Sequence, residues 1–165
     1  MSLFSYYGFM SLQQKELEQA TEKFVHYLKS QKLKLTQQRL EVLEHFLGTR
    51  EHVSADELYQ ELREVNPKIG FSTVYRTLKL LSDSGIAKEN YFRDGFTRYE
   101  NDFNRDHHDH IICTDCNEIF EFENREIEEL QCMVAKNLGF KIVDHQLEIY
   151  AKCNKFPNCP NNKEK

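Results

Sequence analysis

A run of ten residues, 107–116, constrains this chain more than any other segment, because it holds seven side chains that can bind a metal ion. Its two central isoleucines predict a β-strand, in which successive side chains point to opposite faces. His108 and His110 would then lie on one face of the strand, and His107 and Asp109 on the other. One short strand could therefore supply ligands to two separate metal sites.

Four of the five cysteines fall in two pairs. Cys113 and Cys116 have the Cys-x2-Cys spacing at which two thiolates reach one tetrahedral zinc ion, and Cys153 and Cys159 form a wider second pair. In a reducing cytosol such cysteines bind metal more readily than they form disulfides. We therefore expect a four-cysteine zinc site in preference to a disulfide or a thioredoxin-type redox pair. Cys132 follows a helical pattern and is expected to be a partly buried thiol.

The length and composition fit one ordinary domain or two small ones, with 165 residues of which 39% are hydrophobic. No apolar run approaches the ~20 residues of a membrane span and no signal peptide is evident, so the protein is expected to be cytoplasmic, with no membrane partner. The net charge of −5 argues against a uniformly basic surface. Residues 1–101 are neutral overall, so the acidic excess falls in the His- and Cys-rich part, where it suits cations.

Helical periodicity and capping signals predict four helices in the first half of the chain. Thr36 is a predicted N-cap, and Ser54 with Glu57 forms a predicted capping box. The predicted helices cover residues 11–31, 36–47, 54 onward and 72–83. Two extended segments around an Asp-Gly turn, 86–91 and 97–100, then predict a hairpin. The last three helices and this hairpin predict a winged helix-turn-helix.

The second half predicts a small α/β domain, made of strands 109–113, 119–122 and 140–152 and a helix over 125–138. A domain of about 60 residues rarely has a sufficient core of its own, so a zinc site, dimerisation or both are expected. The predicted fold class is α+β. The predicted domains are a winged-helix DNA-binding domain with an N-terminal helix at 1–101, a polar hinge at 102–106, and a metal-binding dimerisation domain at 107–165.

Four short strings together give the chain a resemblance to a known family. They are His52-Val53-Ser54-Ala55, Ser72-Thr73-Val74-Tyr75-Arg76-Thr77-Leu78, His107-His108-Asp109-His110 followed by Cys113-x2-Cys116, and Asp144-His145. The chain resembles the ferric uptake regulator family of bacterial metal-dependent repressors over residues 33–159. It departs from several relatives in the wider spacing of its last cysteine pair, and from some in that Glu100 lies eight residues before His108.

The resemblance implies three metal sites. A structural Zn(II) would be held by Cys113, Cys116, Cys153 and Cys159. A regulatory site would use His52, Glu100, His108, His110 and Glu121, and such imidazole and carboxylate ligands suit Fe(II), Mn(II), Co(II) or Zn(II). An additional site would use His107, Asp109, Glu128 and His145. Since the first two regulatory ligands precede the hinge, the resemblance implies that bound metal joins both domains.

The resemblance also implies that helix 72–83 reads DNA. Tyr75 can pack on thymine methyl groups, and Arg76 can reach a guanine edge or a phosphate. Basic residues at the start of an earlier helix suit the narrow minor groove of A/T-rich DNA. The candidate DNA contacts are Lys34, Thr36, Arg39, Ser72, Thr73, Tyr75, Arg76, Lys79 and Arg93.

The function implied by the resemblance is that of a metal-responsive transcriptional repressor and not of an enzyme. It would bind double-stranded, A/T-rich palindromic operators as a homodimer, with a tetramer left open, and Fe(II) is the favoured regulatory metal. Peroxide sensors of the family more often carry aspartate at the positions of Glu100 and Glu121, and zinc sensors often add a cysteine to the sensing site. A small zinc hydrolase built on His108, His110 and Glu100 is a remote alternative, without a supporting HExxH or nucleophile motif.

Overall fold

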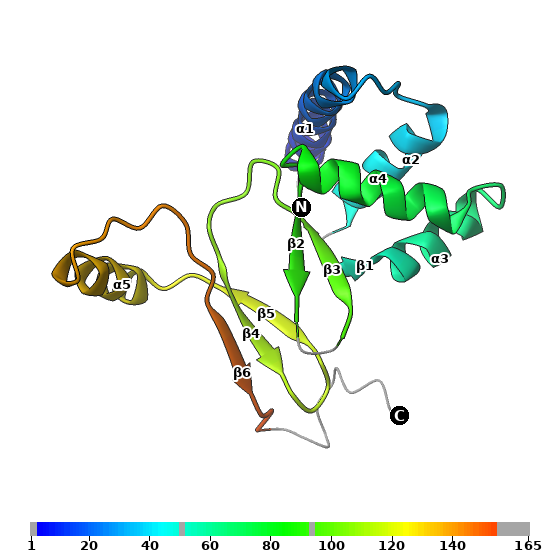
Figure 1. The fold of residues 1–165 in the computed structure, drawn as a ribbon. Helices are drawn as coiled ribbons and strands as arrows, with labels where there is room; N and C mark the ends of the chain where they lie inside the picture. The colour runs from blue at the N-terminus through cyan, green and yellow to red at the C-terminus, as the bar shows by residue number, and fades with distance from the viewer. Residues whose placement is uncertain (1–2, 50–51, 93–94, 155–165) are drawn as a thin grey trace. The chain divides into compact units, whose positions relative to one another are not determined.

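The structure is a computed structural model that describes residues 3–49, 52–92 and 95–154, with side chains from residue 14 onward. The chain divides into two compact units, Met1–Arg105 and Asp106–Lys165 (Figure 1). In the part of the chain that the structure describes, no helix combines the length and the apolar character needed to cross a bilayer.

Four helices build the core of the first unit: α1 (Leu3–Ser30), α2 (Gln37–Gly48), α3 (Ala55–Val65) and α4 (Phe71–Asp83). Helix α1 begins eight residues before the predicted start. Residues 3–10 lack hydrophobic periodicity, so this first part of the helix was not predicted. They contain no proline, so nothing in their sequence interrupts a helix. The four helices bury Phe24, Leu28, Val42, Leu43, Phe46, Leu58, Val74, Leu78 and Leu81 in one core.

The predicted helix caps are confirmed. The Thr36 side chain accepts a hydrogen bond from the backbone N–H of Arg39 at 3.4 Å. Ser54 and Glu57 form a reciprocal capping box at the start of α3. Helix α4 ends in a turn at Gly85, whose φ of +67° disfavours any residue with a Cβ.

A three-stranded antiparallel sheet completes the first unit, with strands β1 (Val53–Ser54), β2 (Ala87–Tyr91) and β3 (Thr97–Asn101) in the order β1-β3-β2. The β2–β3 hairpin is the predicted wing, and its predicted turn residues Arg93 and Asp94 lie outside the described residues. Strand β3 is central, so its side chains meet partners from both neighbours.

The second unit has a sheet formed by β4 (Asp109–Cys113), β5 (Ile119–Phe122) and β6 (Glu148–Ala151), in the order β5-β4-β6. Helix α5 (Arg125–Asn137) follows β5 and precedes β6 along the chain. Strand β4 pairs antiparallel with β5 and parallel with β6. The predicted last strand, 140–152, is wrong in length. Only four of its residues pair with β4, and Val143, which precedes them, is 97% exposed.

Helix α5 leaves an apolar face uncovered. No residue of α5 is buried, and Figure 1 shows the helix standing away from the sheet of its own unit. The expectation that Cys132 is partly buried is therefore wrong for the single chain, where it is exposed. The exposed apolar side chains of α5 and the residues after it are Leu130, Met133, Val134, Leu138 and Phe140. An exposed apolar surface of this kind marks an interaction site.

Candidate functional site

The predicted zinc ligands lie where β4 ends beside β6. Strand pairing stops at Cys113 and Ala151, and the Asp115 carboxylate then accepts a hydrogen bond from the backbone N–H of Cys153 at 2.9 Å. The turn that carries Cys116 is thereby tied to the chain segment that carries Cys153. The fourth predicted ligand, Cys159, lies outside the described residues.

The environment of Cys113 favours a thiolate. Burial raises the pKa of this thiol, but hydrogen bonds from the backbone of Asp115, Cys116 and Cys153 outweigh burial, and the pKa is lowered overall. Zinc binds cysteine as the thiolate. The donor atoms and their polarised surroundings therefore fit a zinc ion.

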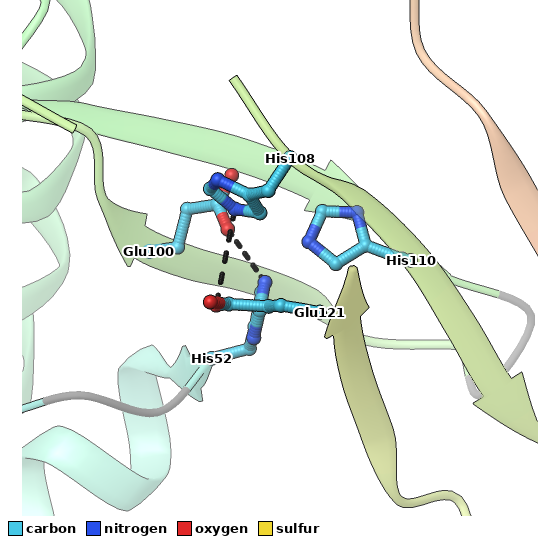
Figure 2. A group of neighbouring side chains, drawn as sticks. All are labelled: His52, Glu100, His108, His110 and Glu121. Carbon is cyan, nitrogen blue, oxygen red and sulfur yellow. Dashed lines mark ion pairs between the residues drawn. The ribbon is translucent and has the colours of Figure 1, made fainter. Parts of the chain in front are cut away.

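The first unit contributes a buried imidazole–carboxylate pair to the candidate regulatory site. His52 Nε2 lies 2.6 Å from Glu100 Oε2, and the two side chains are 5% and 1% exposed (Figure 2). The β1–β3 register pairs Val53 with Tyr99, so one further step puts His52 opposite Glu100. His52 also packs edge-on against the ring of Phe92, at 5.6 Å between ring centroids.

The second unit gathers the other three predicted regulatory ligands. His110 on β4 is the direct cross-strand partner of Glu121 on β5, and His108 Nε2 lies 3.8 Å from Glu121 Oε1 (Figure 2). The rings of His108 and His110 meet edge to face, with 5.1 Å between their centroids. These three side chains therefore come together within their own unit.

A second cluster of four ligands forms entirely within the second unit. Ligand atoms of His107, Asp109, Glu128 and His145 all lie within 4.8 Å of one another. Asp109 on β4 projects to the face opposite His110, which agrees with the alternation predicted from the sequence. Helix α5 supplies Glu128, and the segment before β6 supplies His145.

Asp109 is a buried carboxylate that this cluster does not satisfy by hydrogen bonding. Its side chain is 1% exposed, and neither oxygen has a hydrogen-bond partner among the described residues. The Nε2 atoms of His107 and His145 lie 3.3 and 3.9 Å from Asp109 Oδ1. Buried charges in proteins are paired or coordinate metals. The donor set and the unsatisfied carboxylate thus fit a divalent cation.

The predicted DNA-contact residues lie in the first unit. Helix α4 buries Val74, Thr77, Leu78 and Leu81 and exposes the side that carries Ser72, Tyr75 and Arg76. The Tyr75 ring stacks on that of Phe71, at 6.3 Å between centroids. Arg76 Nε donates to the Ser72 carbonyl, and Arg39 Nη1 donates to the Lys34 carbonyl. These local bonds orient the two guanidinium groups without neutralising their charge.

Lys79, by contrast, is held in an ion pair. Its ammonium group donates to both oxygens of Glu89 at 2.8 Å, and the hydroxyl of Tyr91 donates to the same carboxylate at 2.7 Å. The hydrogen bond to Glu89 raises the pKa of Lys79. Burial raises the pKa of Glu89, but the bonds from Lys79 and Tyr91 outweigh it and lower the pKa overall. The network joins α4 to strand β2.

Comparison with known proteins decides the family. The family model of the ferric uptake regulator family matches residues 30–150. The ferric uptake regulation protein of Neisseria meningitidis serogroup A is 43% identical over 136 residues, which cover 81% of this chain and 94% of that protein. This chain belongs to the ferric uptake regulator family. Membership makes it a metal-responsive regulator of transcription, as its resemblance implied.

Two further members of the ferric uptake regulator family are similar over still more of the chain. The ferric uptake regulation protein of Campylobacter jejuni is 35% identical over 158 residues, 94% of this chain and 98% of that protein. The solved structure of the Helicobacter pylori ferric uptake regulator has a TM-score of 0.78 and 31% identity, covering 84% of this chain and 92% of that one. That protein is described as having three functional metal binding sites.

Sequence reasoning did not predict several residues that contact predicted functional side chains, among them Glu89 and Phe71 on the DNA-binding side. Glu89 neutralises Lys79 across ten residues of sequence, and Phe71 stacks on Tyr75 from one helical turn away. The Phe71–Tyr75 spacing is a sequence signal for a helix-surface pair. The Lys79–Glu89 pair has no such signal, because it depends on how α4 packs against the hairpin.

We expect Lys79→Met to change stability more than DNA affinity. Loss of the pair should lower the free energy of unfolding by about 1 kcal/mol, since Lys79 is 41% exposed and Glu89 only 11%. Adding Glu89→Gln to Lys79→Met should recover most of the lost stability, because it removes the carboxylate charge that Lys79→Met leaves unpaired. Urea unfolding of the variants measures both effects. A normal stability combined with a large fall in the salt dependence of DNA binding would instead identify Lys79 as a phosphate contact.

The pKa shifts of Glu89 and Lys79 set the pH range in which their ion pair stabilises the folded protein. The Glu89 part is present above its ordinary pKa of 4.5 and is lost as pH falls through the lowered folded value. The Lys79 part is present below its ordinary pKa of 10.5 and is lost as pH rises through the raised folded value. The stability difference between wild type and Lys79→Met should therefore be constant near neutral pH and should shrink in acid below 4.5.

Proposed function

We propose that this chain is an Fe(II)-responsive repressor that works in the cytoplasm and binds A/T-rich palindromic operators as a homodimer. The observation that carries the proposal is that both halves of the predicted regulatory site are already assembled within their own units. His52 and Glu100 form a buried pair in the first unit. His108, His110 and Glu121 gather in the second unit.

The proposed switch follows from the hinge between the two sets of ligands. A metal ion that binds His52 and Glu100 together with the ligands of the second unit would restrict how the two units orient. It would favour the DNA-binding arrangement by its higher affinity for that state. Because the coupling is reciprocal, DNA would tighten metal binding by the same factor.

The donor atoms support iron as the regulatory metal. A set of imidazoles and carboxylates without thiolate suits Fe(II), and it also suits Mn(II), Co(II) or Zn(II) as substitutes. The similar proteins from N. meningitidis and C. jejuni are named ferric uptake regulation proteins. Glutamate at positions 100 and 121 and the lack of a cysteine in the set favour iron sensing over peroxide or zinc sensing.

Two other metal sites complete the proposal. A structural Zn(II) on Cys113, Cys116, Cys153 and Cys159 would have four thiolates and no open position, so its role would be to stabilise the fold. A second divalent ion would bind His107, Asp109, Glu128 and His145, where it would compensate the buried Asp109. The zinc would join β4 to the segment after β6, and the second ion would hold α5 near the sheet.

The homodimer is supported by the uncovered apolar face of α5 described above. A second copy of the chain can cover that face, and two-fold symmetry of the dimer would match the two halves of a palindromic operator. Each first unit would then present one α4 to one half-site. Lys34, Thr36, Arg39, Ser72, Thr73 and Arg93 would add contacts around Tyr75 and Arg76.

Arg76→Ala is expected to weaken operator binding by about 1–3 kcal/mol, because the exposed guanidinium of α4 would lose a base-edge or phosphate contact. Fluorescence anisotropy with metal-saturated protein and a labelled operator duplex measures the change. Arg63→Ala is the matched control, since Arg63 is an exposed arginine on α3 outside the proposed contact set. Equal affinities for wild type and Arg76→Ala would contradict a base-edge or phosphate contact by Arg76.

A further inference from the structure

Lys88 lies beside the proposed regulatory ligand Glu100. The two residues are direct cross-strand partners in the β2–β3 hairpin, so their side chains share one face of the sheet. Lys88 Nζ lies 3.8 Å from Glu100 Oε1, while His52 approaches the other carboxylate oxygen at 2.6 Å. Glu100 thus lies between a lysine from one neighbouring strand and the histidine that precedes the other.

Because Glu100 is buried, the positive charge of Lys88 matters for the stability of the fold. The Glu100 side chain is 1% exposed, and a buried carboxylate is costly unless a positive charge compensates it. The ammonium group of Lys88 is such a positive charge, and it lies within ion-pair distance of the carboxylate oxygen Oε1. Lys88 therefore supplies a counter-charge to Glu100 in the metal-free protein.

A divalent cation on Glu100 would change this balance. The metal would compensate the carboxylate, and Lys88 would become a like charge a few ångströms from the ion. The lysine would then stabilise the metal-free state and oppose the metal-bound state. Because its side chain is 32% exposed, solvent would reduce this opposition without removing it.

We propose that Lys88 is a built-in counter-ion that weakens binding of the regulatory metal and so sets the metal concentration at which this protein responds. The inference rests on the proposed function, since it requires that Glu100 be a metal ligand. It adds to that function a residue that would not touch the metal. Lys88 would set the threshold through its charge alone.

The test compares the dissociation constant for Mn(II) in variants at position 88. Isothermal titration calorimetry would use the full zinc-loaded chain with His145→Ala, so that the Asp109 cluster contributes little. Lys88→Met and Lys88→Gln should each lower the dissociation constant about tenfold, the size expected for removing one charge near a divalent ion in a partly solvated site. Lys88→Arg keeps the charge and should bind as the parent does. Lys29→Met removes a lysine from the exposed end of α1 and should also have no effect.

Stability of the metal-free protein provides an independent measurement. Lys88→Met should lower the thermal midpoint when Glu100 is present, because it leaves the buried carboxylate without its lysine. In a Glu100→Gln background the same substitution should have little effect, since no charge remains to compensate. An equal loss in both backgrounds would show that Lys88 acts through packing and would overturn the inference.

The outcomes separate this inference from the function on which it rests. If Glu100→Gln binds Mn(II) as tightly as its parent, the proposed regulatory site is wrong and the inference falls with it. If Glu100→Gln loses Mn(II) binding while Lys88→Met and Lys88→Gln leave the dissociation constant unchanged or raise it, the proposed regulatory site is supported and the role of Lys88 is refuted. Tighter binding in both charge-removing variants, with none in Lys88→Arg, supports it.

Discussion

Replacing Cys113 with serine is expected to release zinc and to unfold much of the second unit. Cys113 is a buried residue at the end of β4, in the turn region that hydrogen bonds tie to Cys153. A closed thiolate site contributes its binding energy directly to folding, so we expect a loss of several kcal/mol, on the order of a whole small domain's stability. Zinc content by atomic emission and the thermal unfolding curve measure the two effects.

Cys132→Ser is the matched control for this prediction. Cys132 is exposed on α5 and belongs to no predicted metal site, so its substitution should preserve both the zinc content and the folded second unit. Cys153→Ser should behave like Cys113→Ser. One tightly held zinc per chain in purified Cys113→Ser protein would contradict the assignment of the four-cysteine site.

Local sequence signals predicted the features of this fold that depend on neighbours along the chain. Ser54 and Glu57 are three residues apart, and their capping box needs only a helix start between them. The alternation of His108 and His110 with His107 and Asp109 follows from a strand, and Asp109 and His110 do project to opposite faces of β4. The clustering of Asp109 with the distant ligands Glu128 and His145 entered through family resemblance.

Features set by tertiary packing were not predicted. The Lys79–Glu89 pair depends on the approach of α4 to the hairpin, and a period of 3.6 residues along α4 shows only that Lys79 faces away from the core. The length of β6 depends on how many residues of β4 are available to pair. Helical periodicity predicted α5 closely, but it could not predict that none of its residues would be buried in the part of the chain that the structure describes.

His108→Ala and His52→Ala are each expected to abolish metal-dependent DNA binding while keeping the structural zinc and the dimer. Each variant removes a ligand from one side of the hinge, and the proposed switch requires ligands from both. The lost coupling should be about 5- to 150-fold in operator affinity, the usual range for allosteric coupling of this kind. His145→Ala removes a ligand of the other cluster and should have a smaller effect.

If metal controls DNA affinity through ligands on both sides of the hinge, one operator titration will show it. Operator DNA is titrated with zinc-loaded wild type and His52→Ala under anaerobic conditions, with and without saturating Fe(II) or Mn(II). We expect metal to tighten operator binding by wild type and to leave the affinity of His52→Ala unchanged. Wild-type affinity that does not respond to metal, or a His52→Ala variant that responds as wild type does, would contradict it.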